Sequence, residues 1–440
     1  MPSRWLDKRW LCAVAVAVCA ATATPARADH EKSDPNAIRG HFDLGQVQGI
    51  LAMDRLDGWL LYDYQGKNDI ALELVNPAPP ISRQWFYLIP RTGQPVALVH
   101  RADMARFARV AGTKIPYDSQ DDLKRQLAQM LRGMDRVAME YAPDSGIPQL
   151  TLVPAGTAKL VEHAGVTIAS SSRLVMLTKS LWRPNGRIAH YLAVHHLTKL
   201  KDEALATIAR ELAAGRQVTD YQIAQQIVAG EKVRGIEGPP PRISSGVRTA
   251  DPNYVPIASA PKPIAGGDLI VISLAGRVTD AERPIYADLT WVAYAGSSVP
   301  ARYAKLFGVV AAARDAAVAA IRDNLEKRRP IRGYVPDQAA RAVIGKAGFA
   351  EKFIHRTGHS LDTDRLGDGT NLDGYETRDT RNLVLGSGFT VGPGIYVPGQ
   401  FGVRSEIDVY IGMSQKLARP AIEITGPVQH AITPIFAPRR

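Results

Sequence analysis

The segment from 388 to 411 constrains the fold more than any other stretch of this chain. It reads GFTVGPGIYVPGQFGVRSEIDVYI, in which short apolar runs alternate with glycine and proline. Glycine and proline at this density interrupt helices, whereas short apolar runs between such residues are typical of β-strands. The segment is therefore predicted to form two short strands hinged by glycine and proline. The second strand carries an acidic pair, Glu406 and Asp408.

Strand and helix patterns divide the chain into two predicted domains, since 440 residues exceed the size of one ordinary core. Residues 29–180 hold three strand-like runs, DGWLLYDY, RQWFYLIP and QPVALVH, and an amphipathic helical pattern, which predicts a small α/β domain. Turn-forming residues within 181–189 predict a linker. Residues 190–440 begin with helices and then alternate strands with an Ala-rich helix near 300–327. The predicted class is α+β, with the chemistry in the second domain.

The first 28 residues are predicted to be a signal peptide. A basic start at Arg4, Lys8 and Arg9 precedes the apolar run WLCAVAVAVCAATA, and the small-x-small motif ARA ends at Ala28. Cleavage near Ala28 predicts export to the periplasm or secretion. The run is shorter than the about 20 apolar residues that span a bilayer. Because no later segment is apolar enough either, no transmembrane segment is expected.

Both cysteines, Cys12 and Cys19, lie within the predicted signal peptide. The exported chain is therefore expected to hold any metal with His, Asp and Glu rather than with thiolates. A lipoprotein signal and a twin-arginine signal fit less well. A lipoprotein signal at Cys19 would need a small residue before the cysteine, and Val18 is larger than that. The Lys8–Arg9 pair is a poor twin-arginine motif.

The chain is basic, with a net charge of +11 at pH 7. Its basic residues are scattered, and the densest run, EKRRPIR at 326–332, is typical of a helix end, where cations interact favourably with the dipole. No basic motif is interleaved with aromatic residues, so a nucleic-acid partner is not expected.

Four polar residues stand out in the second domain: Asp288 in IYADLTW, His355 and His359 in HRTGHS, and Glu406 in GVRSEIDVY. Each has an ordinary structural explanation when taken alone. A buried aspartate can be held by backbone or arginine hydrogen bonds, and a lone histidine is more often a core residue than a ligand. Arg404 and Glu406 share a strand face and can simply form an ion pair.

Taken together, ADLTW, HRTGHS, TVGPGIYV and GVRSEIDVYIG resemble the pita-bread-fold family of Xaa-Pro dipeptidases, aminopeptidase P and creatinase. The runs LDGWLLYD and SRQWFYLIPRTGQPVALVH resemble the creatinase-type N-terminal domain of the same proteins. The resemblance implies a pita-bread domain at 190–440, preceded by a creatinase-like α/β domain at 29–180. It also implies a homodimer and a peptide or small amide as the ligand.

Peptidases of this family hold two divalent metals with two Asp, one His and two Glu. The resemblance implies that Asp288, His359 and Glu406 are the retained ligands, while Ser273 and Gly392 stand where the first Asp and the first Glu would be. It further implies catalytic roles for His355, His359 and Glu406, and substrate binding by His355 and Arg404. Two further family histidines are replaced; their positions are Asn253 and Leu366.

The charges of this set decide what it can hold. Four carboxylates offset the repulsion between two divalent ions, whereas two carboxylates and one imidazole suit at most one ion. We therefore expect an exported, divergent homologue that keeps a peptide-binding or amide-binding cleft and whose peptidase activity is impaired or repurposed.

Two enzymatic alternatives predict a hydrolase of C–N bonds in peptides or amides. In the first, one Mn, Co, Zn or Fe ion sits on Asp288, His359 and Glu406 and supports hydrolysis of Xaa-Pro or related bonds. In the second, no metal is used, and His355 or His359 acts as a base that Glu406 orients, as in creatinase.

Replacement of the lost ligands by nearby acidic residues is less favoured. The candidates are Asp280, Glu282 and Asp408. Asp408 lies about 7 Å beyond Glu406 along the strand, and Asp280 falls in the turn that follows its strand.

Overall fold

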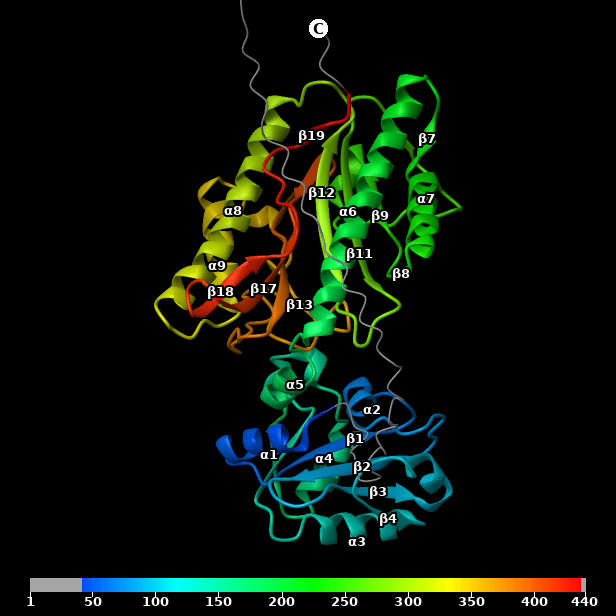
Figure 1. Ribbon diagram of the computed structural model, residues 1–440, viewed down its shortest axis with the longest axis vertical. Helices are drawn as coiled ribbons and strands as arrows, with labels where there is room; N and C mark the ends of the chain where they lie inside the picture. Colours follow the sequence, from blue (N-terminus) through cyan, green and yellow to red (C-terminus); the bar gives the residue numbers. More distant parts are fainter. Residues whose placement is uncertain (1–41, 437–440) are drawn as a thin grey trace, which may run out of the picture. The chain divides into compact units, whose positions relative to one another are not determined.

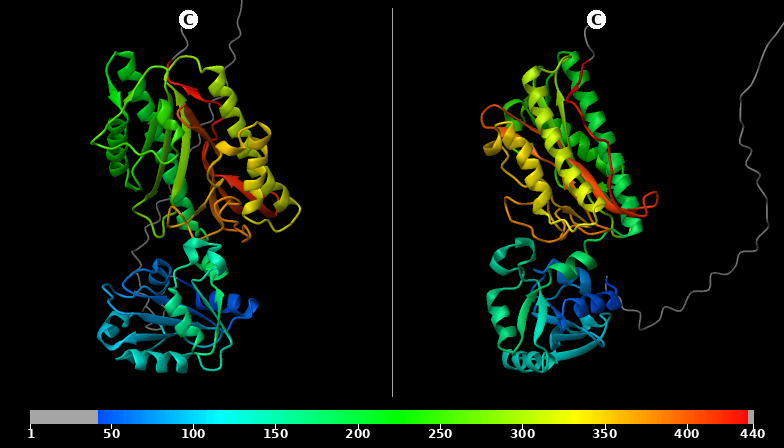
Figure 2. Two further views of the ribbon diagram at one scale, coloured as in Figure 1. Left: turned by 180° about the vertical axis from the view of Figure 1, so that it is seen from behind. Right: turned by 90° about the vertical axis from the view of Figure 1, so that its left-hand side faces the viewer.

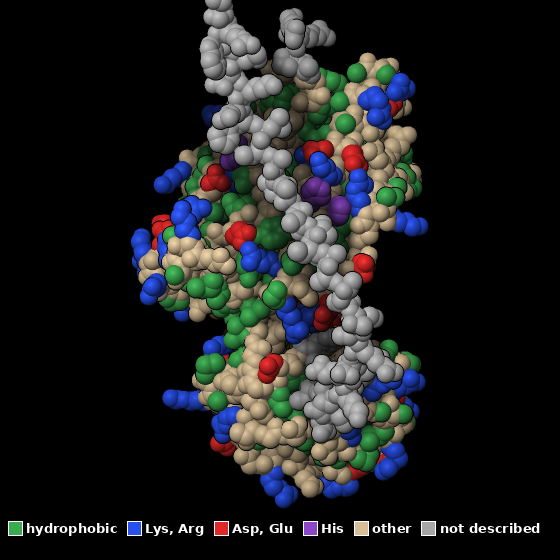
Figure 3. Space-filling view, viewed as in Figure 1, with side chains coloured by type: hydrophobic (Ala, Val, Ile, Leu, Met, Phe, Trp, Pro, Cys, Tyr) green, Lys and Arg blue, Asp and Glu red, His purple; other side chains and the backbone are tan. Residues whose placement is uncertain are grey.

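The structure, a computed structural model, describes residues 42–436. The predicted signal peptide and both cysteines lie outside these residues. Within them, no helix is long and apolar enough to cross a membrane. On the face drawn in Figure 3, basic and acidic side chains are interspersed over the surface rather than gathered into one patch.

The first domain is built on a six-stranded mixed sheet with the strand order β4-β3-β2-β1-β5-β6. Its central strands, β1 and β2, are apolar on both faces because both faces are covered. Trp59 and Trp85 pack into one apolar cluster, whereas Leu60 and Phe86 pack into a second cluster on the other side. The strands are β1 (Gly58–Asp63), β2 (Trp85–Pro90), β3 (Val96–His100), β4 (Thr113–Tyr117), β5 (Arg136–Met139) and β6 (Thr167–Ser170).

The helices of this domain are α1 (Leu44–Met53), α2 (Asp69–Val75), α3 (Gln120–Met130), α4 (Ala155–Glu162) and α5 (Ser172–Thr178). Side-chain caps fix several of their starts, and Ser119, for example, accepts a hydrogen bond from the backbone N–H of Asp122. The α3 helix and the strands β1, β2 and β3 agree with the runs that the sequence indicated.

The second domain begins with the long helix α6 (Pro184–Ala213). Proline at the first helical position is favourable because its missing N–H has no partner there in any case. The segment 181–189, predicted to be a linker, therefore contains the first turns of α6.

Two helix pairs cover two sheets in the second domain (Figures 1 and 2). The helices α6 and α7 (Asp220–Val233) pack on β9 (Arg242–Ser245), β11 (Leu269–Val278) and β12 (Ala287–Tyr294) around one apolar cluster. The helices α8 (Ala301–Glu326) and α9 (Tyr334–Lys346) border a second cluster with β14 (Gly388–Val391), β16 (Phe401–Arg404), β17 (Ile407–Ser414) and β18 (Arg419–Ile424). Short strands complete the domain: β7 (Val218–Thr219), β8 (Ile236–Glu237), β10 (Pro263–Ile264), β13 (Ser360–Leu361), β15 (Gly394–Val397) and β19 (Thr433–Pro434).

The segment 388–411 spans four strands rather than two, so the predicted strand count is wrong. The chain turns at Gly392–Pro393, and again at Gly399, which adopts a positive φ of 71°. Strands β15 and β16 pair with each other as a hairpin, while β14 pairs with β17. The two sheets meet where Thr290 of β12 bridges to Glu406, just before β17.

Candidate active site

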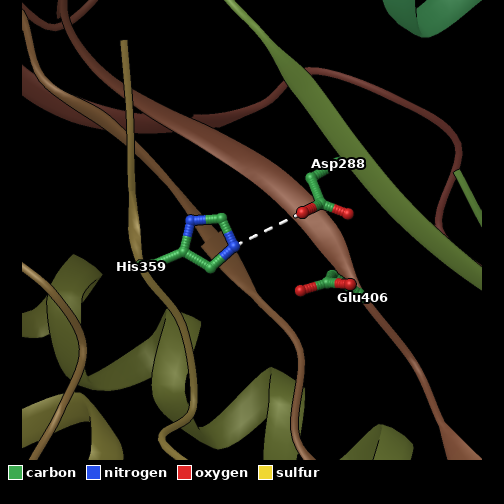
Figure 4. A group of neighbouring side chains, drawn as sticks. All are labelled: Asp288, His359 and Glu406. Carbon is green, nitrogen blue, oxygen red and sulfur yellow. Dashed lines mark ion pairs between the residues drawn. The ribbon is translucent and has the colours of Figure 1, made fainter. Parts of the chain in front are cut away.

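Three segments far apart in the sequence bring Asp288, His359 and Glu406 together. Asp288 lies near the start of β12, His359 immediately precedes β13, and Glu406 immediately precedes β17. All three residues are buried, and one potential ligand atom from each lies within 4.8 Å of the others. Figure 4 shows the imidazole and the two carboxylates side by side. The residues predicted to be metal ligands therefore form one group.

The His359 imidazole presents Nε2 to this group. Its Nδ1 lies 3.1 Å from the Ser360 carbonyl oxygen, which can only accept a hydrogen bond, so in the neutral ring Nδ1 carries the proton and Nε2 the lone pair. Nε2 lies 3.4 Å from Oδ2 of Asp288. Neither Nε2 of His359 nor Oδ1 of Asp288 has a hydrogen-bond partner within residues 42–436. Buried polar atoms of this kind mark a place where a proton, a water molecule or a cation is stabilised.

An arginine is paired with each of the two carboxylates. Nε of Arg365 lies 2.6 Å from Oδ2 of Asp288, and Nη2 of Arg404 lies 2.5 Å from Oε1 of Glu406. The second pair is the ordinary ion pair that the strand spacing allowed. Arg365 was not identified from the sequence, because it lies in an irregular segment between Asp362 and Asp368 that has no periodic pattern.

The arginines and burial act in opposite directions on these acids. Burial alone would raise the pKa of Asp288, but Arg365 and His359 hold it well below its usual value. For Glu406, burial raises the pKa; Arg404 opposes this effect, and the negative charge of Asp288 adds to it. Asp288 is thus the more firmly ionised of the two carboxylates.

A pair of hydroxyls supports Glu406 from the neighbouring strands. Thr290 donates a hydrogen bond to Oε2 of Glu406 at 2.8 Å, and its oxygen lies 2.9 Å from the Ser273 hydroxyl. Since the Thr290 proton points to Glu406, the Ser273 hydroxyl donates to Thr290. Ser273 stands opposite Thr290 in the β11–β12 register and contributes a neutral donor rather than a ligand.

Gly392 has no room for a side chain. A Cβ atom placed on Gly392 would lie 2.6 Å from Oε1 and 2.7 Å from Cγ of Glu406. Arg404 also donates a hydrogen bond from Nε to the Gly392 carbonyl oxygen at 3.2 Å. The volume that a larger residue would need is therefore occupied by the Arg404–Glu406 pair.

His355 is held as a neutral imidazole with both nitrogens occupied. Its Nδ1 lies 2.7 Å from the Arg356 carbonyl oxygen, and its Nε2 lies 2.9 Å from the Tyr396 hydroxyl. Burial, and next the positive charge of Arg404, lower the pKa of His355 to about 3. Both nitrogens of His355 are therefore engaged, whereas Nε2 of His359 has no hydrogen-bond partner among residues 42–436.

A pocket of about 380 Å³ opens beside this group. His359 and the two residues predicted to bind substrate, His355 and Arg404, all line it. Asn253 and Leu366, where the family resemblance implies that two histidines are replaced, line the same pocket. Five of the site residues predicted from the sequence thus line one cavity, whereas Asp288, Glu406, Ser273 and Gly392 are not among its lining residues.

The alternative acidic ligands do not join the group. Oδ2 of Asp408 accepts a hydrogen bond from the backbone N–H of Asp288 at 2.9 Å, and Asp280 and Glu282 line a different pocket. In the part of the chain that the structure describes, Asp288, His359 and Glu406 are the one set of three or more such residues close enough to hold an ion.

These residues do not fit two divalent ions. Ser273 and Gly392 provide no negative charge, and each carboxylate of the group already pairs with an arginine. They do fit one ion, because Oδ1 of Asp288 and Nε2 of His359 are unpartnered atoms of suitable type. An ion on these residues would supply Lewis acidity and activate a water molecule.

Sequence comparisons place this site within a known family. The model of metallopeptidase family M24 matches residues 193–412. A probable dipeptidase, PepE of Mycobacterium tuberculosis, is 25% identical over 346 residues, which cover 77% of this chain and 84% of that protein. The Xaa-Pro dipeptidase of Lactobacillus helveticus is 31% identical over 216 residues, or 47% of this chain and 50% of that protein.

Solved structures agree with the fold. Dipeptidase PepE from Mycobacterium ulcerans has a TM-score of 0.68 at 21% identity and covers 89% of this chain and 96% of its own. The X-prolyl aminopeptidase from Caenorhabditis elegans, described as having a di-nuclear active site, has a TM-score of 0.61 at 16% identity and covers 88% of this chain and 62% of its own. The predicted fold, an N-terminal α/β domain followed by a pita-bread domain, is confirmed.

Proposed function

The chain belongs to metallopeptidase family M24, and we propose that it is a divergent member that binds a peptide or small amide in the pocket beside Asp288, His359 and Glu406, with two-metal hydrolysis impaired or replaced. One observation carries this proposal. Both carboxylates of the group are neutralised by arginines of the same chain.

The physical consequence is a competition between guanidinium groups and metal ions. A dinuclear centre needs enough carboxylates to offset the repulsion between two divalent ions. Here each carboxylate already has a short, charge-assisted hydrogen bond, which an incoming ion would have to replace. Binding of a peptide or an amide in the pocket would then not depend on the ions.

A single-ion hydrolase is the second candidate. It is favoured by the unpartnered atoms Oδ1 of Asp288 and Nε2 of His359. Together with Glu406 they would hold one Mn, Co, Zn or Fe ion. The substrates would be Xaa-Pro or related amide bonds, the class named for the Xaa-Pro dipeptidase of Lactobacillus helveticus.

A metal-free acid–base enzyme of the creatinase type is the third candidate. It is favoured by the lone pair that His359 presents beside Asp288 at 3.4 Å. His359 would take a proton at Nε2, Asp288 would stabilise the resulting imidazolium, and Glu406 would orient the group. His355 fits this role less well, since both of its nitrogens are already hydrogen-bonded.

Elemental analysis of the protein purified without chelator separates these candidates. Wild type, His359→Ala and the control His195→Ala, at an exposed position of α6, are compared. We expect no stoichiometric metal, binding of an Xaa-Pro dipeptide that persists in EDTA, and no turnover. One equivalent of metal per chain that is lost only in His359→Ala would support the single-ion enzyme. Turnover that persists in EDTA but is lost in Glu406→Gln would support the metal-free enzyme. Two equivalents of metal per chain together with Xaa-Pro hydrolysis would overturn the proposal.

We propose in addition that the chain is exported and forms a homodimer. The basic start, apolar run and small-x-small motif of residues 1–28 support export, and the family resemblance supports the dimer. Light scattering coupled to gel filtration tests the dimer, since a monomer at micromolar concentration would contradict it.

A further inference from the structure

More arginines than acidic residues line the pocket beside the candidate site. Four arginines line it, together with a single acidic residue, Glu376. Three of the arginines have acidic partners: Arg365 pairs with Asp288, Arg404 with Glu406, and Arg356 with Glu376. The fourth, Arg242, adds a positive charge that these pairs do not balance.

Arg242 is the first residue of β9 and lies opposite Ser273 in the strand register. Its one hydrogen bond is a long contact of 3.4 Å from Nη1 to the Pro252 carbonyl oxygen. It forms no ion pair with any acidic residue among residues 42–436. Burial lowers the pKa of Arg242, and the positive charges of Arg365 and Arg404 lower it further, whereas the negative charges of Asp288 and Glu406 oppose this effect only in part. A half-buried guanidinium beside other cations is an unfavourable arrangement unless an anion accompanies it.

We infer that the pocket binds a ligand through an oxyanion, a carboxylate or a phosphate, held by Arg242 at the side where Arg365 and Arg404 also face the cavity. This inference rests on the proposed function and names the chemical class of the ligand. The pocket volume of about 380 Å³ suits a small molecule. The planar fork of a guanidinium matches the oxygens of carboxylates and phosphates.

Other occupants satisfy the pocket less well. A divalent cation would face four guanidinium groups, and a neutral amide would leave Arg242 uncompensated. Arg242 also borders an adjoining cavity of about 20 Å³, next to Ser273 and Thr290. That cavity has room for about one water molecule, so the oxyanion belongs in the larger pocket.

Isothermal titration calorimetry with three probes tests the inference: glutarate, inorganic phosphate and the neutral, N-acetylated dipeptide amide acetyl-Gly-Pro-NH₂. Wild type should bind glutarate, phosphate or both, and the affinity should weaken as the NaCl concentration rises. Arg242→Gln should weaken that binding about tenfold or more, since a charge-assisted hydrogen bond is lost. The anion affinity of Arg242→Lys should lie between those of wild type and Arg242→Gln, because lysine keeps the positive charge but not the planar fork of the guanidinium.

Arg216→Gln is the control for net charge, because Arg216 is exposed and pairs with Glu211 away from the pocket. It should bind the anions like wild type, and the melting temperature of each variant shows that it is folded. Glutarate binding alone would identify a carboxylate ligand, and phosphate binding alone a phosphorylated one.

No binding of either anion by wild type, or equal binding by Arg242→Gln, would overturn the inference. The same loss in Arg216→Gln would also overturn it, since it would show only a general charge effect. The neutral probe acetyl-Gly-Pro-NH₂ separates this failure from that of the proposed function. If this neutral probe binds while both anions fail to bind, the proposed function stands and only the oxyanion inference is overturned. If the neutral probe also fails to bind, both the proposed function and the inference are overturned.

Discussion

Arg365 donates a hydrogen bond from Nε to Oδ2 of Asp288 across 2.6 Å, and so joins the irregular segment 362–368 to strand β12. Asp288 is fully buried, whereas 22% of the Arg365 side chain is exposed in the pocket. The pair therefore combines a buried anion with a cation that a ligand can reach. It therefore holds a structural contact in place, and under the proposed anion binding it would also face the ligand.

Replacing Arg365 by methionine should destabilise the protein by about 3–5 kcal/mol, because it leaves a buried charge without its partner. Mn²⁺ should then raise the melting temperature of the variant more than that of wild type, since the freed carboxylate accepts a cation. Thermal unfolding with and without Mn²⁺ measures both effects. Arg216→Met, which removes an exposed ion pair with Glu211, should change neither the stability nor the response to Mn²⁺ by much. An Arg365→Met protein as stable as wild type would show that the pair contributes nothing.

Gly392→Ala should destabilise the protein by about 1–3 kcal/mol, the cost of overpacking, since the new Cβ would lie 2.6 Å from Oε1 of Glu406. Gly308→Ala is the matched control: it lies on an exposed turn of α8 with no atom near the added Cβ, and it should stabilise by about 0.5–1 kcal/mol. Urea unfolding of both variants measures the difference. Equal effects would contradict the tight packing at Gly392.

Glu231 predicts a pH dependence of stability that is separate from the site. Burial on α7 raises its pKa to about 7, so the folded protein binds a proton that the unfolded chain releases near pH 4.3. This group should therefore lower the free energy of unfolding as the pH rises from about 4.3 to about 7. Glu231→Gln should be more stable than wild type at pH 8 and similar to it at pH 4. The variant Glu162→Gln, at an exposed position, should have the same free energy of unfolding as wild type at pH 4 and at pH 8. Identical pH profiles of stability for all three proteins would refute the prediction.

Lys179 should act on the same segment as Arg365. Its buried Nζ lies 2.7 Å from Asp364 and 2.8 Å from Asp368, on either side of Arg365 in the sequence. Lys179→Met should destabilise by about 3–5 kcal/mol, and its effect should not add to that of Arg365→Met, because both hold one segment in place. Chemical unfolding of the single and double variants measures the coupling. Additive losses would show that the two contacts act independently, and the surface variant Lys124→Met should change stability little.

Export predicts a defined mature end. Expression in a bacterial host followed by fractionation should place the protein outside the cytoplasm, with an N-terminus at Asp29. N-terminal sequencing and intact mass measure the cleavage site. A full-length protein that still begins at Met1 in the cytoplasmic fraction would contradict the prediction.

Motif order predicted the fold and the grouping of the site better than it predicted local detail. The apolar runs of β1 and β2 are evident because both faces are buried, and Asp288, His359 and Glu406 stand within short family motifs. The sequence pattern predicted two strands within 388–411 where the structure has four, because the turns at Gly392–Pro393 and Gly399 separate very short runs.

Arg365 and Arg242 were missed for a different reason. Arg365 meets Asp288 across 77 positions of sequence and lies outside any helix or strand. No periodic pattern marks such a residue. The one available sign was its position beside Leu366, where the family resemblance implies a replaced histidine. Arg242 follows a run of three prolines, so its charge near the site depends on tertiary contacts that local sequence does not encode.

The two ion pairs, Arg365–Asp288 and Arg404–Glu406, also bear on how the protein matures. The positive charges that neutralise these carboxylates are translated with the chain, so the site reaches electrical balance as soon as folding ends. Charge balance at these two carboxylates therefore requires no ion while the chain folds. A protein built in this way would reach the same folded state in metal-poor and metal-rich surroundings, and chelators in its environment would not unfold it.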